Sequence, residues 1–294
     1  MATVDLHAAR AFLAAHGRVL DRFRLDLLLG GDDPGAVLRA VGAYRNADGG
    51  YGWGLEPDLR ARESQPAAAM HAFEVMAEAA VGDHAPAREL CDWLARHTLP
   101  DGALPFALPI ADPTACAPFW TGADPTAPSL MMTAQVAANA HRVGRHDRSV
   151  ADHPWLARAS AYCTTAIAGI DGAPHAYELL FALRFLDAAG AGAQTGSLLD
   201  HLGQYVPSDG RVHVAGGAAD EALHLLDISA DPSAPSRRLF SDEAVAADRS
   251  RLARLQQPDG GWPVDFQSYS PAAALEWRGY ATVAAVAALR DDHR

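Results

Sequence analysis

The segment from residue 54 to residue 66 holds the densest set of polar side chains in the chain. Within it, Glu56 and Asp58 are two residues apart, and Arg60 follows at the same spacing. Two close carboxylates repel each other, so the pKa of one rises, while a nearby arginine can hold the other ionised. A carboxyl group that stays protonated is a general acid able to start a carbocation cyclisation. We therefore predict Glu56, Asp58 and Arg60 as catalytic residues.

A structural role for the same three residues is the alternative. A loop carboxylate commonly accepts backbone N–H bonds and pairs with a neighbouring arginine, without taking part in chemistry. The sequence leaves both interpretations of this acidic segment open.

Aromatic side chains gather near the expected loops and helix starts, where their π faces could stabilise a cationic intermediate. Trp277 and Tyr280 are one helical turn apart. Phe119 and Trp120 lie in the proline-rich segment 100–128, which exceeds the usual length of a connection and is predicted to act as a lid. The predicted substrate-binding residues are Trp53, Gln65, Phe119, Trp120, Tyr177, Phe266, Tyr269, Trp277 and Tyr280.

Metal binding has weaker support. His175, His213 and His224 lie near Asp220 and Glu221 along the chain. Glu221 and His224 can share a helix face, but an isolated Glu-x-x-His pair lacks a full ligand set. The glycine motifs of nucleotide-binding proteins and the GxSxG of serine hydrolases are also missing. We predict neither a metal nor a cofactor.

A repeated Asp-Gly pair organises the elements that must position these residues. Glycine suits a helix C-terminus and Asp can close a turn on its own backbone, so each pair is predicted to stop a helix. Prolines downstream are predicted to start the next helices, at Pro66, Pro128, Pro174 and Pro271. The Asp-Gly pairs are 48–49, 101–102, 171–172, 209–210 and 259–260.

Strand signals are nearly absent, because no segment alternates apolar and polar residues at a spacing of two. With the five repeats, this predicts an all-α fold with almost no sheet. We expect residues 1–294 to form one domain, an α/α toroid of about five to six helical hairpins.

The stretch from Arg251 to Trp262, which contains Gln-Gln-Pro-Asp-Gly-Gly-Trp, resembles the QW repeat of squalene-hopene and oxidosqualene cyclases, and residues 45–53 form a looser copy. The resemblance is to the terpenoid cyclase and protein prenyltransferase superfamily of α/α toroids. It implies inner and outer helices around a central cavity, with Trp262 and Trp53 packed between helices. The Asp-x-Asp-Asp and Asp-Asp-x-x-Asp motifs and the zinc ligands of prenyltransferases have no counterpart.

Composition sets outer limits on function. The chain has 24 basic and 36 acidic residues and a formal charge of −12, so nucleic acid is not an expected partner. No signal peptide or apolar run long enough to cross a membrane is visible. Three cysteines without CxxC spacing suggest neither a disulfide framework nor a zinc knuckle. We expect a cytoplasmic protein; its oligomeric state is left open.

These observations lead to one functional prediction and two alternatives. The resemblance implies a terpene-cyclase-like or prenyltransferase-like enzyme that holds an apolar, isoprenoid-type small molecule and uses the segment 56–60 for acid-base chemistry. A carbohydrate-processing α/α-toroid enzyme, a glycosidase or lyase, is the second interpretation, because paired carboxylates and stacking aromatics also serve sugars. The third is a non-catalytic, repeat-built binding module.

Overall fold

The computed structural model describes residues 4–190 and 192–290 of the chain. These residues form an all-α fold, which confirms the predicted fold class. The helices are α1 (Leu6–His16), α2 (Val19–Leu28), α3 (Pro34–Gly42), α4 (Pro66–Ala79), α5 (Ala85–His97), α6 (Pro118–Thr121), α7 (Leu130–Gly144), α8 (Arg148–Ala151), α9 (Pro154–Ala168), α10 (Ala176–Ala189), α11 (Ala193–Gly203), α12 (Leu225–Ile228), the 3-10 helix η1 (Pro235–Leu239), α13 (Asp242–Arg254) and α14 (Pro271–Leu289).

Sheet structure in the described residues is limited to two short antiparallel pairs and two isolated bridges, Arg45 with Tyr51 and Leu59 with Cys116. β1 (Leu104–Pro105) pairs with β2 (Pro128–Ser129), and β3 (Val212–His213) pairs with β4 (Ala222–Leu223). Each strand is two residues long, so the pairs hold loops together and build no sheet layer. None of the described helices is both long and apolar enough to traverse a bilayer.

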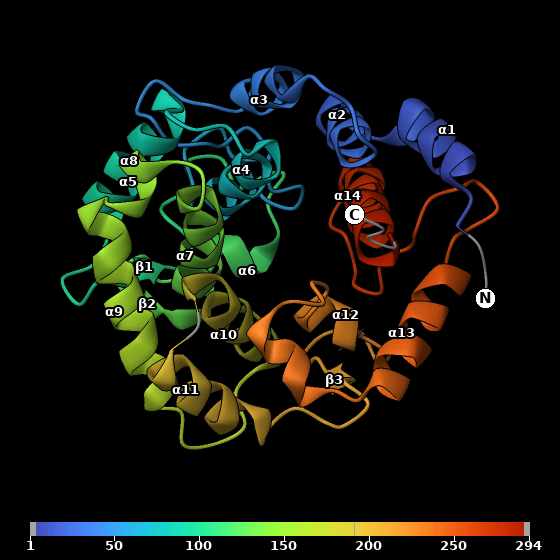
Figure 1. Cartoon of the computed structure of the whole chain (residues 1–294). Coiled ribbons are helices and arrows are strands. Elements are labelled where there is room, and N and C mark those ends of the chain that lie inside the picture. Colours follow the sequence, from blue (N-terminus) through green and yellow to red (C-terminus); the bar gives the residue numbers. More distant parts are fainter. Residues whose placement is uncertain (1–3, 191, 291–294) are drawn as a thin grey trace.

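The helices form an outer and an inner set (Figure 1). The outer set, α1, α2, α3, α5, α9, α11 and α13, follows the periphery, while α4, α7, α10 and α14 lie nearer the middle. α7 packs between α4 and α10. Its buried face is rich in alanine, which allows close approach of neighbouring helices. A closed toroid of five or six hairpins with a central cavity stays a prediction.

Two apolar cores support this arrangement. The larger one runs through the inner helices and their outer neighbours and includes the fully buried Phe73, Trp93 and Trp155. The smaller one joins α1 to α14, with Phe12 and Trp262 at its centre. The first and last helices of the chain are therefore held together by their own core.

The Asp-Gly pairs adopt one turn design at four of their five positions. The glycines at 49, 102, 210 and 260 have positive φ between 71° and 97°, and each aspartate oxygen accepts the N–H two residues on. The pair 171–172 differs, because Gly172 lies outside the left-handed region. This confirms the predicted turn chemistry at four copies.

The prediction that each Asp-Gly pair stops a helix is wrong. α3 already ends at Gly42 and α13 at Arg254, several residues before the pairs at 48–49 and 259–260. The pair 48–49 instead lies inside a turn that follows the helix, in which the Asn46 N–H donates to Gly50 O and the Gly49 N–H to Asn46 O. The pair therefore shapes the connection between one helix, which has already ended, and the next, which has not yet begun.

The proline rule for helix starts holds at two of four positions. Pro66 and Pro271 open α4 and α14, as predicted. α7 begins two residues after Pro128, because Pro128 belongs to β2 and Ser129 caps the helix by accepting the Met132 N–H. α10 likewise begins after Pro174, at a His175 cap.

The QW-like segment ties the end of the chain to its beginning. The Gln256 amide oxygen accepts the Asp5 N–H at 2.9 Å, and its NH₂ group donates to Asp5 O at 2.8 Å and to Gly260 O at 3.0 Å. Asp5 is the N-cap of α1. The buried Trp262 donates its indole N–H to Leu252 O at 2.8 Å. This places Trp262 in the structural role predicted for it.

Replacing Gln256 with alanine is expected to lower the free energy of unfolding by about 1–2 kcal/mol, since it removes two hydrogen bonds to Asp5, the N-cap of α1, and one to Gly260 within the last connection. Urea denaturation followed by far-UV circular dichroism measures the change. Gln257→Ala is the matched control, because the Gln257 side chain donates within its own loop, to Leu255 O. Equal losses in the two variants would contradict the role of Gln256 in joining the chain ends.

Candidate functional site

Contacts with distant parts of the chain hold the acidic segment, residues 54–66, which leads into α4. Leu55 and Leu59 are buried in the larger core, Arg18 of α2 donates to Leu55 O at 2.9 Å, and the Ala117 N–H donates to Asp58 O at 2.8 Å. These contacts hold the segment between α2, the 104–129 segment and the inner helices. Its side chains are therefore positioned by elements from three distant parts of the chain.

Glu56 begins a buried chain of polar groups that runs along α4. Its carboxylate lies 2.9 Å from His71 Nε2, and His71 Nδ1 lies 3.5 Å from a Glu74 oxygen. Glu56 and His71 are 5% and 3% exposed. Burial, the largest influence, disfavours the charged imidazole, but hydrogen bonds and charges from both carboxylates outweigh it and raise the pKa of His71.

Glu74 connects this chain to α2 and α14. One of its oxygens accepts the Tyr280 hydroxyl proton at 2.9 Å, and Arg24 Nη2 lies 3.3 Å from the carboxylate. Burial favours the neutral acid, yet the charges of Arg24 and His71 prevail and hold the pKa of Glu74 well below its ordinary value. Arg24 also forms a two-point ion pair with Glu78 and lies 5.1 Å from the centre of the Tyr280 ring.

Asp58, two residues after Glu56, contacts α14 and the loop that precedes it. One oxygen accepts the Tyr269 backbone N–H at 2.9 Å and the other accepts the Trp277 indole N–H at 2.7 Å. Burial raises the pKa of Asp58, and the nearby negative charge of Glu56 adds to the rise, against the two hydrogen bonds. A raised pKa in a buried carboxyl group makes Asp58 a candidate for a functional acid.

Arg60 does not have the predicted partner. Its guanidinium forms a two-point ion pair with Glu276 of α14, at 2.7 and 3.2 Å, and pairs with neither Glu56 nor Asp58. Glu276 lies near the beginning of α14, and in the folded chain it is the acid that pairs with Arg60. The side chain that contacts the Glu56 carboxylate is His71.

Most predicted substrate-binding residues surround Asp58. On α14, Trp277 and Tyr280 meet edge to face at 5.6 Å, and Phe266 packs on Trp277 at 5.2 Å. Tyr269 contacts Phe119 edge to face at 5.6 Å, and both are half-exposed. The buried Trp120 lies against Phe119 and stacks on Phe106 at 4.5 Å. The structure brings together Phe119, Trp120, Phe266, Tyr269, Trp277 and Tyr280.

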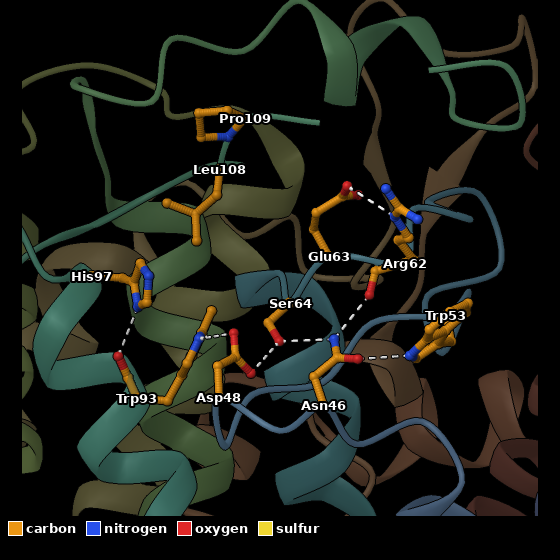
Figure 2. A pocket seen from close by; sticks show the side chains of 10 residues that line it. All are labelled: Asn46, Asp48, Trp53, Arg62, Glu63, Ser64, Trp93, His97, Leu108 and Pro109. Atoms are coloured by element: carbon orange, nitrogen blue, oxygen red, sulfur yellow. Dashed lines mark hydrogen bonds and ion pairs between the residues drawn. The ribbon is translucent and has the colours of Figure 1, made fainter. Parts of the chain in front are cut away.

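Three other predicted residues lie elsewhere. The side-chain amide of the buried Gln65 bonds the backbone of Leu108. Its oxygen accepts the Leu108 N–H at 2.9 Å, and its NH₂ group donates to the Leu108 carbonyl at 3.2 Å. The Tyr177 hydroxyl donates to Glu221, at the end of β3 and β4. Trp53 lines a separate hollow beside α5 (Figure 2). These side chains belong to other contacts because tertiary packing turned them away from Asp58.

The predicted lid is an anchored segment. The Leu104 N–H donates to Thr133 Oγ1 at 2.8 Å, β1 pairs with β2, and Leu59 forms a bridge with Cys116. α6 carries Phe119 and Trp120, and Phe119 packs against Tyr269. The segment therefore forms one wall of the candidate site.

Sequence reasoning missed Arg24, His71, Glu74 and Glu276. His71 and Glu74 carried a usable signal, because they are three residues apart on a helix predicted to start at Pro66 and so share a face directly after the acidic segment. Arg24 had none, since α2 lies far from this segment in sequence. Among the described residues, no group of three or more His, Cys, Asp or Glu side chains is arranged to hold a metal.

Comparison of the chain with models of known protein families and with curated protein sequences finds no match. The likeness to terpenoid cyclases and prenyltransferases accordingly stays a prediction from the QW-like repeats.

Proposed function

We propose that this chain is an enzyme of the terpene-cyclase-like class that protonates a largely apolar, isoprenoid-type substrate. Asp58 serves as the general acid and Glu56 as its partner. The observation that carries the proposal is a buried carboxyl group of raised pKa whose oxygens accept the Tyr269 N–H and the Trp277 indole N–H, next to a group of aromatic side chains. Fold and repeat pattern supply the analogy, and the site supplies the chemistry.

The proposed step needs no external oxidant or reductant. The Asp58 proton is transferred to one carbon of a substrate double bond, whose π electrons form the new C–H bond and leave a cation on the adjacent carbon. The Asp58 carboxylate that remains is stabilised by the Tyr269 and Trp277 N–H groups. Return of a proton from the cation to this carboxylate completes an isomerisation or cyclisation.

The charges around Asp58 suit this role. His71, whose pKa is raised, contacts the Glu56 carboxylate, and Arg60 forms its ion pair with Glu276. Asp58 is left without a direct cationic partner, which favours its protonated form. This assigns to His71 the task that the sequence had suggested for Arg60.

The substrate class follows from the walls of the site. Trp277 meets Phe266 and Tyr280 at right angles, so the three rings form one aromatic cluster beside Asp58. Tyrosine and tryptophan faces attract cations, and Arg24 already uses the Tyr280 ring in this way. An apolar chain that becomes cationic during the reaction is complementary to such walls.

Asp58→Asn is expected to reduce turnover by about 100-fold or more, since it removes the proton donor. The assay incubates the protein with farnesol or geranylgeraniol in D₂O and measures deuterated or cyclised products by mass spectrometry. The native rate should fall as pH rises through the pKa of Asp58, because only the protonated carboxyl can donate. Thermal melting establishes that the variant is folded.

Asp124→Asn is the control, since Asp124 is exposed and its carboxylate accepts the N–H and hydroxyl of Thr126 in its own turn. It should keep the native rate. Unchanged turnover in Asp58→Asn would contradict the assigned acid. Binding of both alcohols without any product would favour the non-catalytic alternative.

A further inference from the structure

A hollow lies between the end of the acidic segment, at Arg62 to Ser64, and α5 (Figure 2). Its volume is about 500 Å³, within the range of small-molecule sites. The lining residues are Asn46, Asp48, Trp53, Arg62, Glu63, Ser64, Trp93, His97, Leu108 and Pro109. Of these, only Trp53 figured in the predicted substrate site, so this hollow has no role in the proposed reaction.

Trp53 is held rigidly while remaining open to solvent. Its indole N–H donates to Asn46 Oδ1 at 2.6 Å and its backbone N–H donates to Ala61 O at 2.8 Å, yet the residue is 56% exposed. Its φ is +58°, in the left-handed region that bulky residues rarely adopt. Such strain persists only where the surroundings enforce it, and it concentrates at ligand sites. The structure thus presents a fixed, bare indole face.

The floor of the hollow is a closed hydrogen-bond network. Asp48 accepts from Ser64 Oγ at 2.8 Å and from the Trp93 indole at 3.1 Å, while the Asn46 NH₂ group donates to Arg62 O and to Ser64 Oγ. These bonds are visible in Figure 2. Because the polar groups of the floor bond one another, the floor is rigid. Ligand contacts are expected from the groups above it.

Three polar groups above the floor are available. The Arg62 side chain is 73% exposed and meets Glu63 only loosely, at 3.6 Å. His97 bonds the Trp93 carbonyl through Nδ1, which leaves Nε2 without a partner in the part of the chain that the structure describes. Donors and acceptors are therefore offered side by side at the rim.

The remaining wall is apolar and fixed. It consists of Leu108 and Pro109, and the buried Gln65 clamps Leu108 through both its N–H and its carbonyl. In Figure 2 these two residues lie across the hollow from the network of Asp48 and Ser64. The Gln65 amide therefore holds this wall in place, a structural role that differs from the predicted substrate contact.

We propose that this hollow binds a neutral saccharide, with a sugar ring stacked on Trp53 and its hydroxyl groups hydrogen-bonded to Arg62, Glu63 and His97. A sugar ring has an apolar C–H face that suits an indole and a rim of hydroxyls that both donate and accept. Arg62 and Glu63 oppose each other in charge, so a strongly charged ligand would meet a like charge. A quaternary ammonium ion requires a cage of several aromatic faces, whereas Trp53 is the exposed one here.

The test titrates the full chain with cellohexaose, maltohexaose, xylohexaose and chitohexaose and monitors tryptophan fluorescence and indole N–H signals by NMR. We expect at least one hexaose to perturb Trp53. Trp53→Ala should weaken that binding by about tenfold or more, because the stacking surface is lost. Trp53→Phe should retain part of it. Arg62→Ala, an exposed substitution that leaves the fold intact, should also weaken it.

Phe119→Ala is the matched control, since Phe119 is an exposed aromatic at the Asp58 site. It should leave saccharide binding unchanged. The proposal is overturned if no hexaose binds, if Trp53→Ala binds as tightly as the native chain, or if choline or a decaproline peptide binds at Trp53 in place of the sugars. These results are independent of turnover by Asp58.

Discussion

Gly260→Ala is expected to lower the free energy of unfolding by about 2–5 kcal/mol, the sum of a backbone effect and a packing effect. A left-handed backbone costs an L-residue about 1–2 kcal/mol, and Gly260 has φ +92°. The new methyl group would also overlap the Ala8 carbonyl of α1, which is backbone and cannot turn aside. Overpacking of this kind costs about 1–3 kcal/mol. The last turn would be forced off the first helix.

Two other glycines separate these contributions. Gly30 has φ +95° with nothing near its missing side chain, so Gly30→Ala should show the backbone cost alone. Gly172 has the same Asp-Gly context but neither strain nor a close neighbour, so Gly172→Ala should be neutral or stabilising by about 0.4–1 kcal/mol. Chemical denaturation of the three variants provides the comparison. A Gly260→Ala loss no larger than that of Gly30→Ala would contradict the close docking of the turn on α1.

Arg24→Met is expected to destabilise the chain by about 3–5 kcal/mol at pH 7, because it leaves buried carboxylates without their cation. Arg24 is 4% exposed and pairs with Glu74, Glu78 and Asp21 at 3.3, 2.6 and 3.8 Å. Methionine keeps the volume of the side chain, so the loss reports charge more than packing. The measurement is urea denaturation at several pH values.

The pH dependence gives this variant a specific signature. The folded-state pKa of Glu74 lies below its unfolded value, so its contribution to stability is present above the unfolded pKa and is lost as pH falls. Without Arg24, burial raises the pKa of Glu74, and the acid protonates at higher pH. The stability gap between native and variant chains should therefore narrow between pH 7 and about pH 4.

Arg10→Met is the control for Arg24→Met. Arg10 pairs with Asp26, and both side chains are about half exposed. The loss should stay below about 1 kcal/mol, since solvent screens exposed ion pairs. A gap for Arg24→Met that is equally small, or that does not change with pH, would show that the buried network does not stabilise the fold.

How much could be read in advance is clearest at the Asp-Gly pairs. Asp-Gly chemistry is local, because the side chain bonds a backbone N–H two residues away, and four of five turns adopt the predicted form. Helix ends were misplaced, because where α3 and α13 stop depends on the packing of the next turn. Pro128 illustrates the same limit, since pairing with β1 overrides its preference for a helix start.

The candidate site shows a sharper division. Glu56 and Asp58 could be selected as a pair of close carboxylates from their spacing, and Trp277 and Tyr280 from their helical spacing. Their partners could not, because Asp58 meets Trp277 and Tyr280 meets Glu74 across more than 200 positions of sequence. Arg60 was assigned to the nearest acid along the chain, whereas in space Glu276 is closer.

By itself, the sequence determined what is local: helical segments, Asp-Gly turns, the near absence of sheet, and which side chains could bear a proton or stack on a ligand. The tertiary structure alone decided which of these meet. It placed His71 against Glu56, separated Trp53 from the aromatic group around Asp58, and docked the last turn on α1. The physical reason is that pKa, burial and ligand contacts depend on distances in space, and packing of helices remote in sequence sets those distances.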